Sequence, residues 1–269
     1  MATQQTFYSL LREAVRYFAV HGYEDAQALA EWVMRLRGAA EREAGSSALS
    51  EQAIRKALGA YYERAVSLAR LRKHHPGVSR FTVDLVRPEM RRELDRRILA
   101  SVDLIRINRD RAIEQTLQRF SGWVSSVPVG GSKVVDKLET VAHIAKPVAQ
   151  VKYEARRLSI DQGHKLLAAI DAVIGEQSGA IAMEWHSHWR QAGYDYREDH
   201  KERDGKIYAI RDSWAVKAGL INKGAGWSDA MTQPAEEVFC RCNAYYINML
   251  DDLPDSMLTE KGRRYMRKA

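Results

Sequence analysis

The chain has few cysteines and no long apolar run. Its 269 residues include two cysteines, which excludes a disulfide framework and is typical of a reducing compartment. The longest segment without Asp, Glu, Lys or Arg runs from Phe120 to Ser132, far short of the roughly 20 apolar residues that a membrane-spanning helix needs. The N-terminal segment also lacks the pattern of a secretory signal. We therefore expect a soluble protein made in a cytoplasm, with no membrane partner.

The sequence also lacks a phosphate-binding loop, an internal repeat and a low-complexity tract. No run of the form Gly-x-x-x-x-Gly-Lys-Ser/Thr occurs, and residues 129–133 contain glycines and a lysine without the required spacing. A motor driven by ATP is therefore not encoded here.

Positive charge is in moderate excess and unevenly spread. The net charge is +7, and residues 51–100 hold 12 basic and 6 acidic side chains, which supply most of it. Such a stretch can bind nucleic acid through phosphate contacts. However, Glu89 and Glu93 precede Arg92 and Arg97 at the spacing that favours ion pairs on a helix. A solvated helix face is therefore the favoured interpretation, and a DNA-binding face is the alternative.

Hydrophobic periodicity predicts that most of the first 190 residues are helical. The expected segments are a helix that ends at His21-Gly22, one around residues 29–36, one from Ser50 to Leu71, one from Pro88 to about residue 124, and one over about 133–190 with a break at Ala145-Lys146-Pro147. On the last of these, Trp185 and Trp189 would anchor the helix to the core, while His186 and His188 would face different directions.

Glycines become frequent from Gly193 onward, and residues 206–208 and 242–247 suit short strands. The sequence therefore predicts an α+β fold, with a mainly helical N-terminal region followed by a smaller α+β C-terminal domain with short strands. The expected boundaries are a helical region over 1–124, a linker over 125–132, a domain over 133–248 and a basic tail over 249–269. Five of the last nine residues are basic, so we expect a flexible electrostatic arm.

A dense polar cluster spans residues 195–205, and Cys240-Arg241-Cys242 follows downstream. One interpretation is a zinc site. Cys240 and Cys242 would point to the same face of a strand, His200 would join them, and His188 or Asp195 would be the fourth ligand. Against it, Cys-x-Cys is not the usual knuckle spacing and no second pair occurs. The alternative is two small buried apolar side chains on a strand.

Two further interpretations of the cluster remain. Asp199 and His200 could act as a general base in a hydrolase or nuclease, although adjacent side chains diverge and no histidine follows His200. In the structural interpretation, Asp195, Arg197 and His200 tie a turn together, and Asp204-Gly205 forms a tight turn between short strands. We favour the structural interpretation, which needs no catalytic residue and no cofactor.

The order of residues in this region resembles the C-terminal signature of the phage Mu F-like minor head proteins, also called phage head morphogenesis proteins. The residues that match are Trp189, Asp195, Arg197, His200, Asp204, Gly205, Tyr208, Pro234, Cys240, Arg241 and Cys242. The resemblance covers residues 150–248, and more loosely 85–248. It departs from the family pattern between Tyr208 and Cys240, where the link is longer and residues 234–239 replace a Pro-Pro-x-Gly run.

This resemblance implies a minor capsid protein of a tailed phage, without enzymatic activity. Such a protein lies inside the head at the portal vertex, after synthesis in the host cytoplasm, and assists head assembly and DNA packaging, retention or ejection. Its expected partners are the portal protein and packaged double-stranded DNA, with the major capsid or scaffolding protein as further candidates. Residues 1–124 would dock on the portal. The alternative function is a metal-dependent, nuclease-like enzyme that uses His200, Cys240, Cys242 and a carboxylate such as Asp195.

Overall fold

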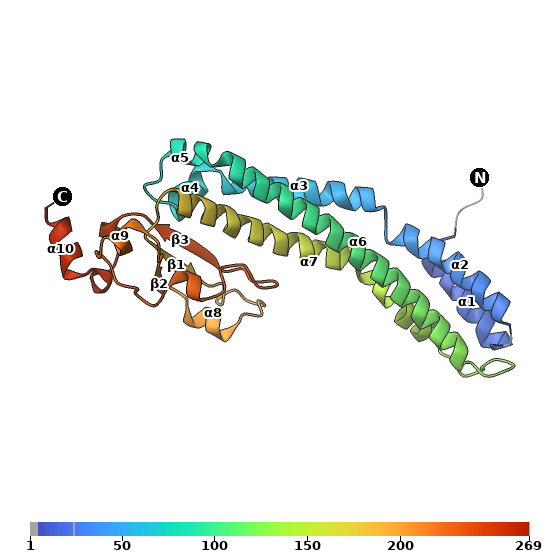
Figure 1. The fold of residues 1–269 in the computed structure, drawn as a ribbon. Coiled ribbons are helices and arrows are strands. Elements are labelled where there is room, and N and C mark those ends of the chain that lie inside the picture. The colour runs from blue at the N-terminus through green and yellow to red at the C-terminus, as the bar shows by residue number, and fades with distance from the viewer. Residues whose placement is uncertain (1–4, 24, 269) are drawn as a thin grey trace. The chain divides into compact units, whose positions relative to one another are not determined.

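The computed structural model describes residues 5–23 and 25–268 (Figure 1). The chain divides into two compact units, each built from two segments: Met1–Ile54 with Ala100–Leu158, and Arg55–Leu99 with Ser159–Ala269. The long helices are α3 (Ser47–Ala65), α6 (Arg87–Ser126) and α7 (Lys137–Gln177), and each contributes residues to both units. The compact units therefore do not follow the linear boundaries expected from the sequence.

The first unit is a helical bundle around an apolar core. Helix α1 (Phe7–His21) presents one buried stripe to α2 (Ala26–Glu43) and to the neighbouring parts of α6 and α7. The rings of Phe18 and Phe120 meet edge to face with centroids 5.9 Å apart. Apolar spacing of three and four residues explains why these helices form, since each buries one face.

Helix α7 continues through Pro147, so the break expected at Ala145-Lys146-Pro147 was wrong. Proline has no N–H and therefore leaves the carbonyl of His143, four residues earlier, without its helical donor. The guanidinium of Arg119 on α6 donates to that carbonyl at 2.8 Å. Ala145 and Val148 on either side of the proline are buried in the core of the unit. Tertiary packing and a substitute donor thus keep the helix intact.

Residues 125–132, expected to form a linker between domains, lie within the first unit: 125–126 end α6, and 127–132 belong to the connection to α7. The connection packs on the end of α1, where the amide of Ser132 donates to the carbonyl of Ala19 at 2.8 Å. Gly22 has φ of 73°, and a Cβ there would lie 2.2 Å from the carbonyl oxygen of Pro128. The glycine-rich sequence therefore reflects close backbone packing rather than a flexible spacer.

The second unit contains a three-stranded antiparallel sheet in the order β2-β1-β3. The strands are β1 (Ala182–His186), β2 (Ile207–Ala209) and β3 (Asn243–Ile247). Met183 on the central strand pairs with Tyr208 on one side and with Tyr246 on the other. These strands confirm the α+β fold class and the positions expected near 206–208 and 242–247.

Two helix ends in the second unit differ from expectation. The helix expected to run to Leu71 ends at Ala65, and α4 (Leu68–His74) begins afresh with Ser67 as its N-cap. Helix α7 ends at Gln177 instead of continuing to about residue 190, because Gly179 takes up φ of 75° and the chain then enters β1. Trp185 and His186 therefore lie on a strand, and His188 lies beyond its end.

Residues 250–268 are folded, which corrects the expectation of a flexible arm. Leu250, Leu253, Met257 and Leu258 are buried in an apolar core of the second unit. The short helices α8 (Glu198–Glu202), α9 (Trp214–Lys217) and α10 (Glu260–Met266) complete the unit, together with 3-10 turns at Ser228–Ala230, Leu250–Asp252 and Asp255–Met257. No helix in the described part of the chain has the length and apolar character needed to span a membrane.

Candidate functional site

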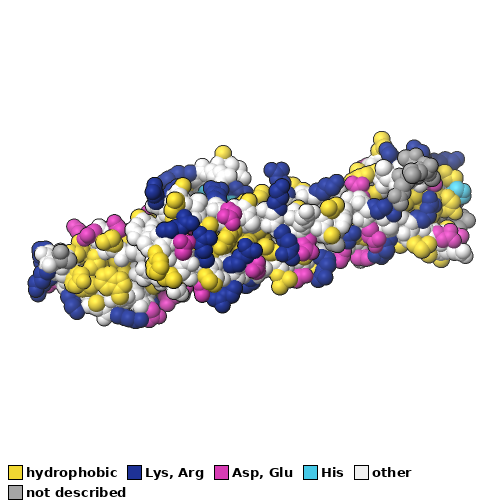
Figure 2. Space-filling model, turned by 90° about the horizontal axis from the view of Figure 1, so that it is seen from above, with side chains coloured by type: hydrophobic (Ala, Val, Ile, Leu, Met, Phe, Trp, Pro, Cys, Tyr) yellow, Lys and Arg dark blue, Asp and Glu magenta, His cyan; other side chains and the backbone are white. Residues whose placement is uncertain are grey.

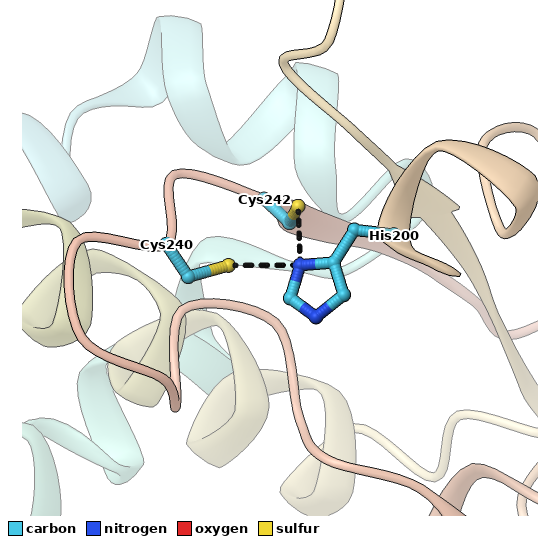
Figure 3. Close-up of side chains that lie close together, drawn as sticks. All are labelled: His200, Cys240 and Cys242. Atoms are coloured by element: carbon cyan, nitrogen blue, oxygen red, sulfur yellow. Dashed lines mark hydrogen bonds between the residues drawn. The ribbon is translucent and has the colours of Figure 1, made fainter. Parts of the chain in front are cut away.

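The structure brings His200, Cys240 and Cys242 together in the second unit (Figure 3). Nδ1 of His200, on α8, lies 3.5 Å from the sulfur of Cys240 and 3.5 Å from the sulfur of Cys242. The three residues are 1%, 0% and 3% exposed, respectively. The ring of Trp185 closes one side of the site, with its centroid 5.2 Å from that of His200. The three donors therefore face one another in an enclosed space.

The loop that delivers the two cysteines has an unusual backbone. Ala235 and Phe239 both have positive φ, at 63° and 59°, which costs energy for residues other than glycine. Two side chains on α7 hold this loop. Asp161 accepts from the amide of Phe239 at 2.7 Å, and Lys165 donates to the carbonyl of Glu236 at 2.7 Å. The loop conformation is thus fixed by α7, which explains how both thiols reach one histidine.

A carboxylate lies at the other nitrogen of the His200 ring. Oε2 of Glu237 is 3.3 Å from Nε2 of His200. The same oxygen is 2.6 Å from Nε of Arg197, whose guanidinium also donates to the carbonyl of Val238 at 3.0 Å. An acid beside Nε2 favours the tautomer with hydrogen on that nitrogen, which leaves the lone pair of Nδ1 directed at the sulfurs. The carboxylate of Glu237 therefore lies in charge contact between the guanidinium of Arg197 and the ring of His200.

The pKa values of the two thiols shift in opposite directions. The contact with Cys242 lowers the pKa of Cys240 to about 5, and the same contact raises the pKa of Cys242. The hydroxyl of Ser187 and the backbone of His188 lie beside the Cys242 sulfur and partly oppose that rise in its pKa. The environment thus favours one thiolate next to His200. Soft sulfur and imidazole donors in this arrangement can hold a transition metal.

Asp204 organises the chain that enters the site. Its carboxylate accepts from the amide of Ser187 and from the indole N–H of Trp189, both at 2.8 Å. Burial opposes ionisation of Asp204, but these two hydrogen bonds prevail and hold its pKa below the ordinary value. Gly205 follows with φ of 73°, and its amide donates to the carbonyl of Trp185 at 2.8 Å. The Asp-Gly pair therefore lies in the turn from α8 to β2, not between two strands as expected from the sequence, and this turn is tied to β1.

The remaining residues of the signature lie around this core. The guanidinium of Arg241 lies 5.3 Å from the ring centre of Tyr194, whose hydroxyl accepts from the Arg241 amide. Pro234 precedes the strained loop. Asp195 is exposed and does not belong to the grouped donors. The ring of His188 packs against His164 instead, with centroids 6.5 Å apart. Neither residue considered as a fourth ligand therefore joins the three.

Sequence reasoning missed a second buried polar cluster in the same unit. Asp171, on α7, is 1% exposed and forms an ion pair with Arg70 on α4. His75 lies with Nε2 3.3 Å from the same carboxylate, and its ring stacks on that of Tyr246. His74 is also buried nearby. The only available signal was the pair His74-His75, which the sequence marks simply as the end of a helix.

Several arginines of the basic stretch pair with neighbouring acids on α6. Glu93 contacts Arg96 at 2.6 Å and Arg97 at 2.8 Å, and Arg92 lies 3.0 Å from Glu89. On the face shown in Figure 2, basic and acidic side chains are interspersed. This pattern is that of a solvated helix face with i,i+3 and i,i+4 ion pairs, the interpretation favoured from the sequence.

Comparisons with protein-family models, with curated proteins and with solved structures found no match to this chain.

Proposed function

We propose that the protein is a minor head protein of a tailed phage and acts through binding rather than catalysis. The observation that carries this proposal is the ordered signature from Trp189 to Cys242, which resembles that of the Mu F-like head proteins. In the fold, four of these residues, Arg197, His200, Cys240 and Cys242, come together, with Glu237 between Arg197 and His200. Arg197 contacts Glu237, Glu237 contacts His200, and His200 contacts both cysteines. Contacts of this kind among signature residues are consistent with a structural role for the signature.

Burial of the donor atoms argues against the enzyme alternative. A nuclease must place a phosphodiester and a water molecule beside its metal or its general base. His200, Cys240 and Cys242 are almost fully covered, and Asp195 is exposed and outside their group. Asp199 lies 3.9 Å from Nε2 of His200, but Nδ1 of that ring is directed at the thiols. The cluster therefore suits the stabilisation of a small domain better than attack on a polymer.

The proposed location is the interior of the head at the portal vertex, with the portal protein as the main partner. Helical surfaces of the region 1–124 would dock on the portal. Exposed apolar side chains of the first unit, among them Met34 and Ile107, are available for such a contact. Packaged DNA is the second partner. The excess of seven positive charges favours weak association with it, without base recognition. The major capsid or scaffolding protein would contact this protein only during assembly.

Quantitative mass spectrometry of density-purified particles tests this proposal. We expect a low and fixed ratio of this protein to the major capsid protein, measured before and after DNA ejection. A decrease after ejection would identify a protein that leaves with the genome. If the protein were missing from the particles, and if heads assembled and packaged DNA normally without its gene, the proposal would be wrong.

A matched pair of variants tests whether the signature cluster is needed for incorporation into heads. Asp204→Ala removes the acceptor of two hydrogen bonds in the cluster, whereas Asp212→Ala changes an acid whose side chain is 89% exposed. Complementation of a gene deletion with Asp204→Ala should lower incorporation into particles, and Asp212→Ala should behave as wild type. Equal incorporation of both would show that the cluster is not needed in the head.

A further inference from the structure

We propose that His200, Cys240 and Cys242 bind one Zn²⁺ ion, through Nδ1 of the histidine and the two sulfurs. The spacing of the donors fits this metal. Zn–S bonds of about 2.3 Å and Zn–N bonds of about 2.0–2.1 Å in a tetrahedron place sulfur and nitrogen roughly 3.6 Å apart. Nδ1 lies 3.5 Å from each sulfur. All three donor atoms lie within 4.8 Å of one another, and both nitrogen–sulfur distances match those of a zinc tetrahedron (Figure 3).

The surroundings of His200 are those of a metal ligand. A histidine that binds a metal through one nitrogen commonly donates from the other nitrogen to a carboxylate, which fixes the ring and its tautomer. Glu237 occupies that position, 3.3 Å from Nε2, and Arg197 holds the carboxylate at 2.6 Å.

Zinc is favoured over other ions by the donor set and by burial. Two sulfurs and one imidazole nitrogen are borderline-soft ligands, which suit Zn²⁺ and disfavour Ca²⁺ and Mg²⁺. Among the described residues no further His, Cys, Asp or Glu joins the group, so a water molecule is the expected fourth ligand. Three protein ligands and a water are more usual for catalytic zinc. However, ligands that are 0–3% exposed give a substrate no access, so we infer a structural role for the ion.

The ion would connect parts of the chain that are distant in sequence. His200 belongs to α8, Cys240 ends the strained loop, and Cys242 directly precedes β3. Ligation by thiolates releases the thiol protons to solvent and adds the binding free energy to the stability of the fold. Zinc would therefore hold the loop in the conformation that α7 also supports through Asp161 and Lys165.

Metal binding by the full-length chain tests this inference directly. The reduced protein is stripped with a chelator and titrated with Zn²⁺ in competition with a chromophoric chelator, and its metal content is measured after dialysis. We expect one Zn²⁺ per chain with a dissociation constant below 1 μM, an order of magnitude typical of buried thiolate sites. Titration with Co²⁺ should give the charge-transfer absorption of a cobalt–thiolate bond. If zinc did not bind stoichiometrically, or if that absorption did not appear, the proposal would be overturned.

Variants assign the ligands. Cys240→Ser should weaken Zn²⁺ binding at least 100-fold, and Glu237→Gln should weaken it about 10–100-fold through loss of ring positioning. His143→Ala, at an exposed histidine, is the matched control and should bind as wild type. Retention of zinc by Cys240→Ser would contradict the assignment. If circular dichroism shows that Cys240→Ser does not fold, the assignment rests on two other measurements. These are the Co²⁺ spectrum of the wild type and the zinc affinity of Glu237→Gln.

This inference does not depend on the proposed function. The particle assay measures incorporation into heads, and the titration measures metal on the isolated chain. If the protein is in heads but binds no zinc, only the proposed metal site is wrong. If it binds zinc but is missing from particles, only the proposed head function is wrong.

Discussion

The carboxylate of Glu237 lies 3.3 Å from Nε2 of His200, while Nδ1 of the same ring faces two thiols at 3.5 Å. Both sides of one buried imidazole are therefore occupied by groups that specify its orientation. The loop that supplies Glu237 also supplies Cys240, so a single short segment contacts the ring from both nitrogens. This arrangement explains why a residue on α8 and a loop some forty residues later depend on each other.

We predict that Arg197→Ala destabilises the second unit by about 1–2 kcal/mol, toward the low end for a hydrogen bond to a charged group because the side chain is 39% exposed. Arg197 holds Glu237 at 2.6 Å and the carbonyl of Val238 at 3.0 Å, so its removal frees the acid that positions His200. Urea unfolding measures the change. Arg264→Ala, which removes an exposed partner of Glu260, is the control and should change stability by less than about 0.5 kcal/mol. Equal effects would refute the special role of Arg197.

Asp204→Ala should cost more, about 2–3 kcal/mol, because it leaves two donors without their acceptor. These donors are the amide of Ser187 and the indole of Trp189, both at 2.8 Å. The expected signature is a lower midpoint of thermal unfolding and a change in tryptophan fluorescence. Asp212→Ala serves as the exposed control. An unchanged midpoint for Asp204→Ala would show that neighbouring waters replace the acid.

Local pattern was sufficient to predict the fold class and the identity of the clustered residues. Apolar spacing predicted α1 to its last residue, and strand-like runs predicted β2 and β3. The spacing of Cys240 and Cys242 suggested two thiols on one side, and the structure places both at His200. These features depend on residues close together in sequence, where periodicity and turn chemistry are informative.

Features that depend on distant residues could not be predicted. Glu237 was not identified as the partner of His200, because nothing in the sequence indicates which acid approaches a given ring. The continuation of α7 through Pro147 depends on Arg119, which is 28 positions away and supplies the missing donor. The strand at Ala182–His186 was assigned to a helix because its apolar spacing is compatible with both, and only the turn at Gly179 distinguishes them.

The substitute donor for Pro147 can be tested by a double-mutant cycle. Arg119→Ala should destabilise the first unit by about 1 kcal/mol, since the carbonyl of His143 loses its donor. Pro147→Ala restores a helical N–H to that carbonyl. In the Pro147→Ala background, Arg119→Ala should therefore have little effect. Strictly additive effects in urea unfolding would show that Arg119 does not compensate for the proline.

Two helical glycines should respond to alanine in opposite directions. A Cβ at Gly175 would lie 2.3 Å from the ring of Tyr246, whereas nothing lies within 4 Å of a Cβ at Gly59. Gly59→Ala should stabilise the protein by about 0.5–1 kcal/mol through helix propensity. Gly175→Ala should destabilise it by about 1–3 kcal/mol, because α7 and β3 must move apart. Stabilisation by both variants, measured in urea, would mean that Tyr246 repacks without cost.

Acid should destabilise the second unit through its buried histidines before the carboxylates titrate. Burial lowers the pKa of His74 to about 4, and the charges of Arg70 and His75 lower it further, against the opposing effect of Asp171. His164 is lowered to about 4 as well, chiefly by burial and by Arg241. Between pH 4 and 6.5 the unfolded chain binds more protons than the folded chain, so stability rises with pH in this window.

The expected loss between pH 7.5 and pH 5 is at most about 2 kcal/mol for each of these two histidines. Glutamine cannot take up the proton, so His74→Gln should remove the contribution of His74, roughly half of the combined loss. This holds whatever the effect of the substitution on stability at pH 7.5. The measurement is the free energy of unfolding in urea at both pH values for the wild type and the variant. His21→Gln, at an exposed histidine of the first unit, should leave the difference unchanged. A pH dependence that is the same in wild type and His74→Gln would mean that His74 already carries its proton in the folded chain, and Asp171 would then hold it as an imidazolium.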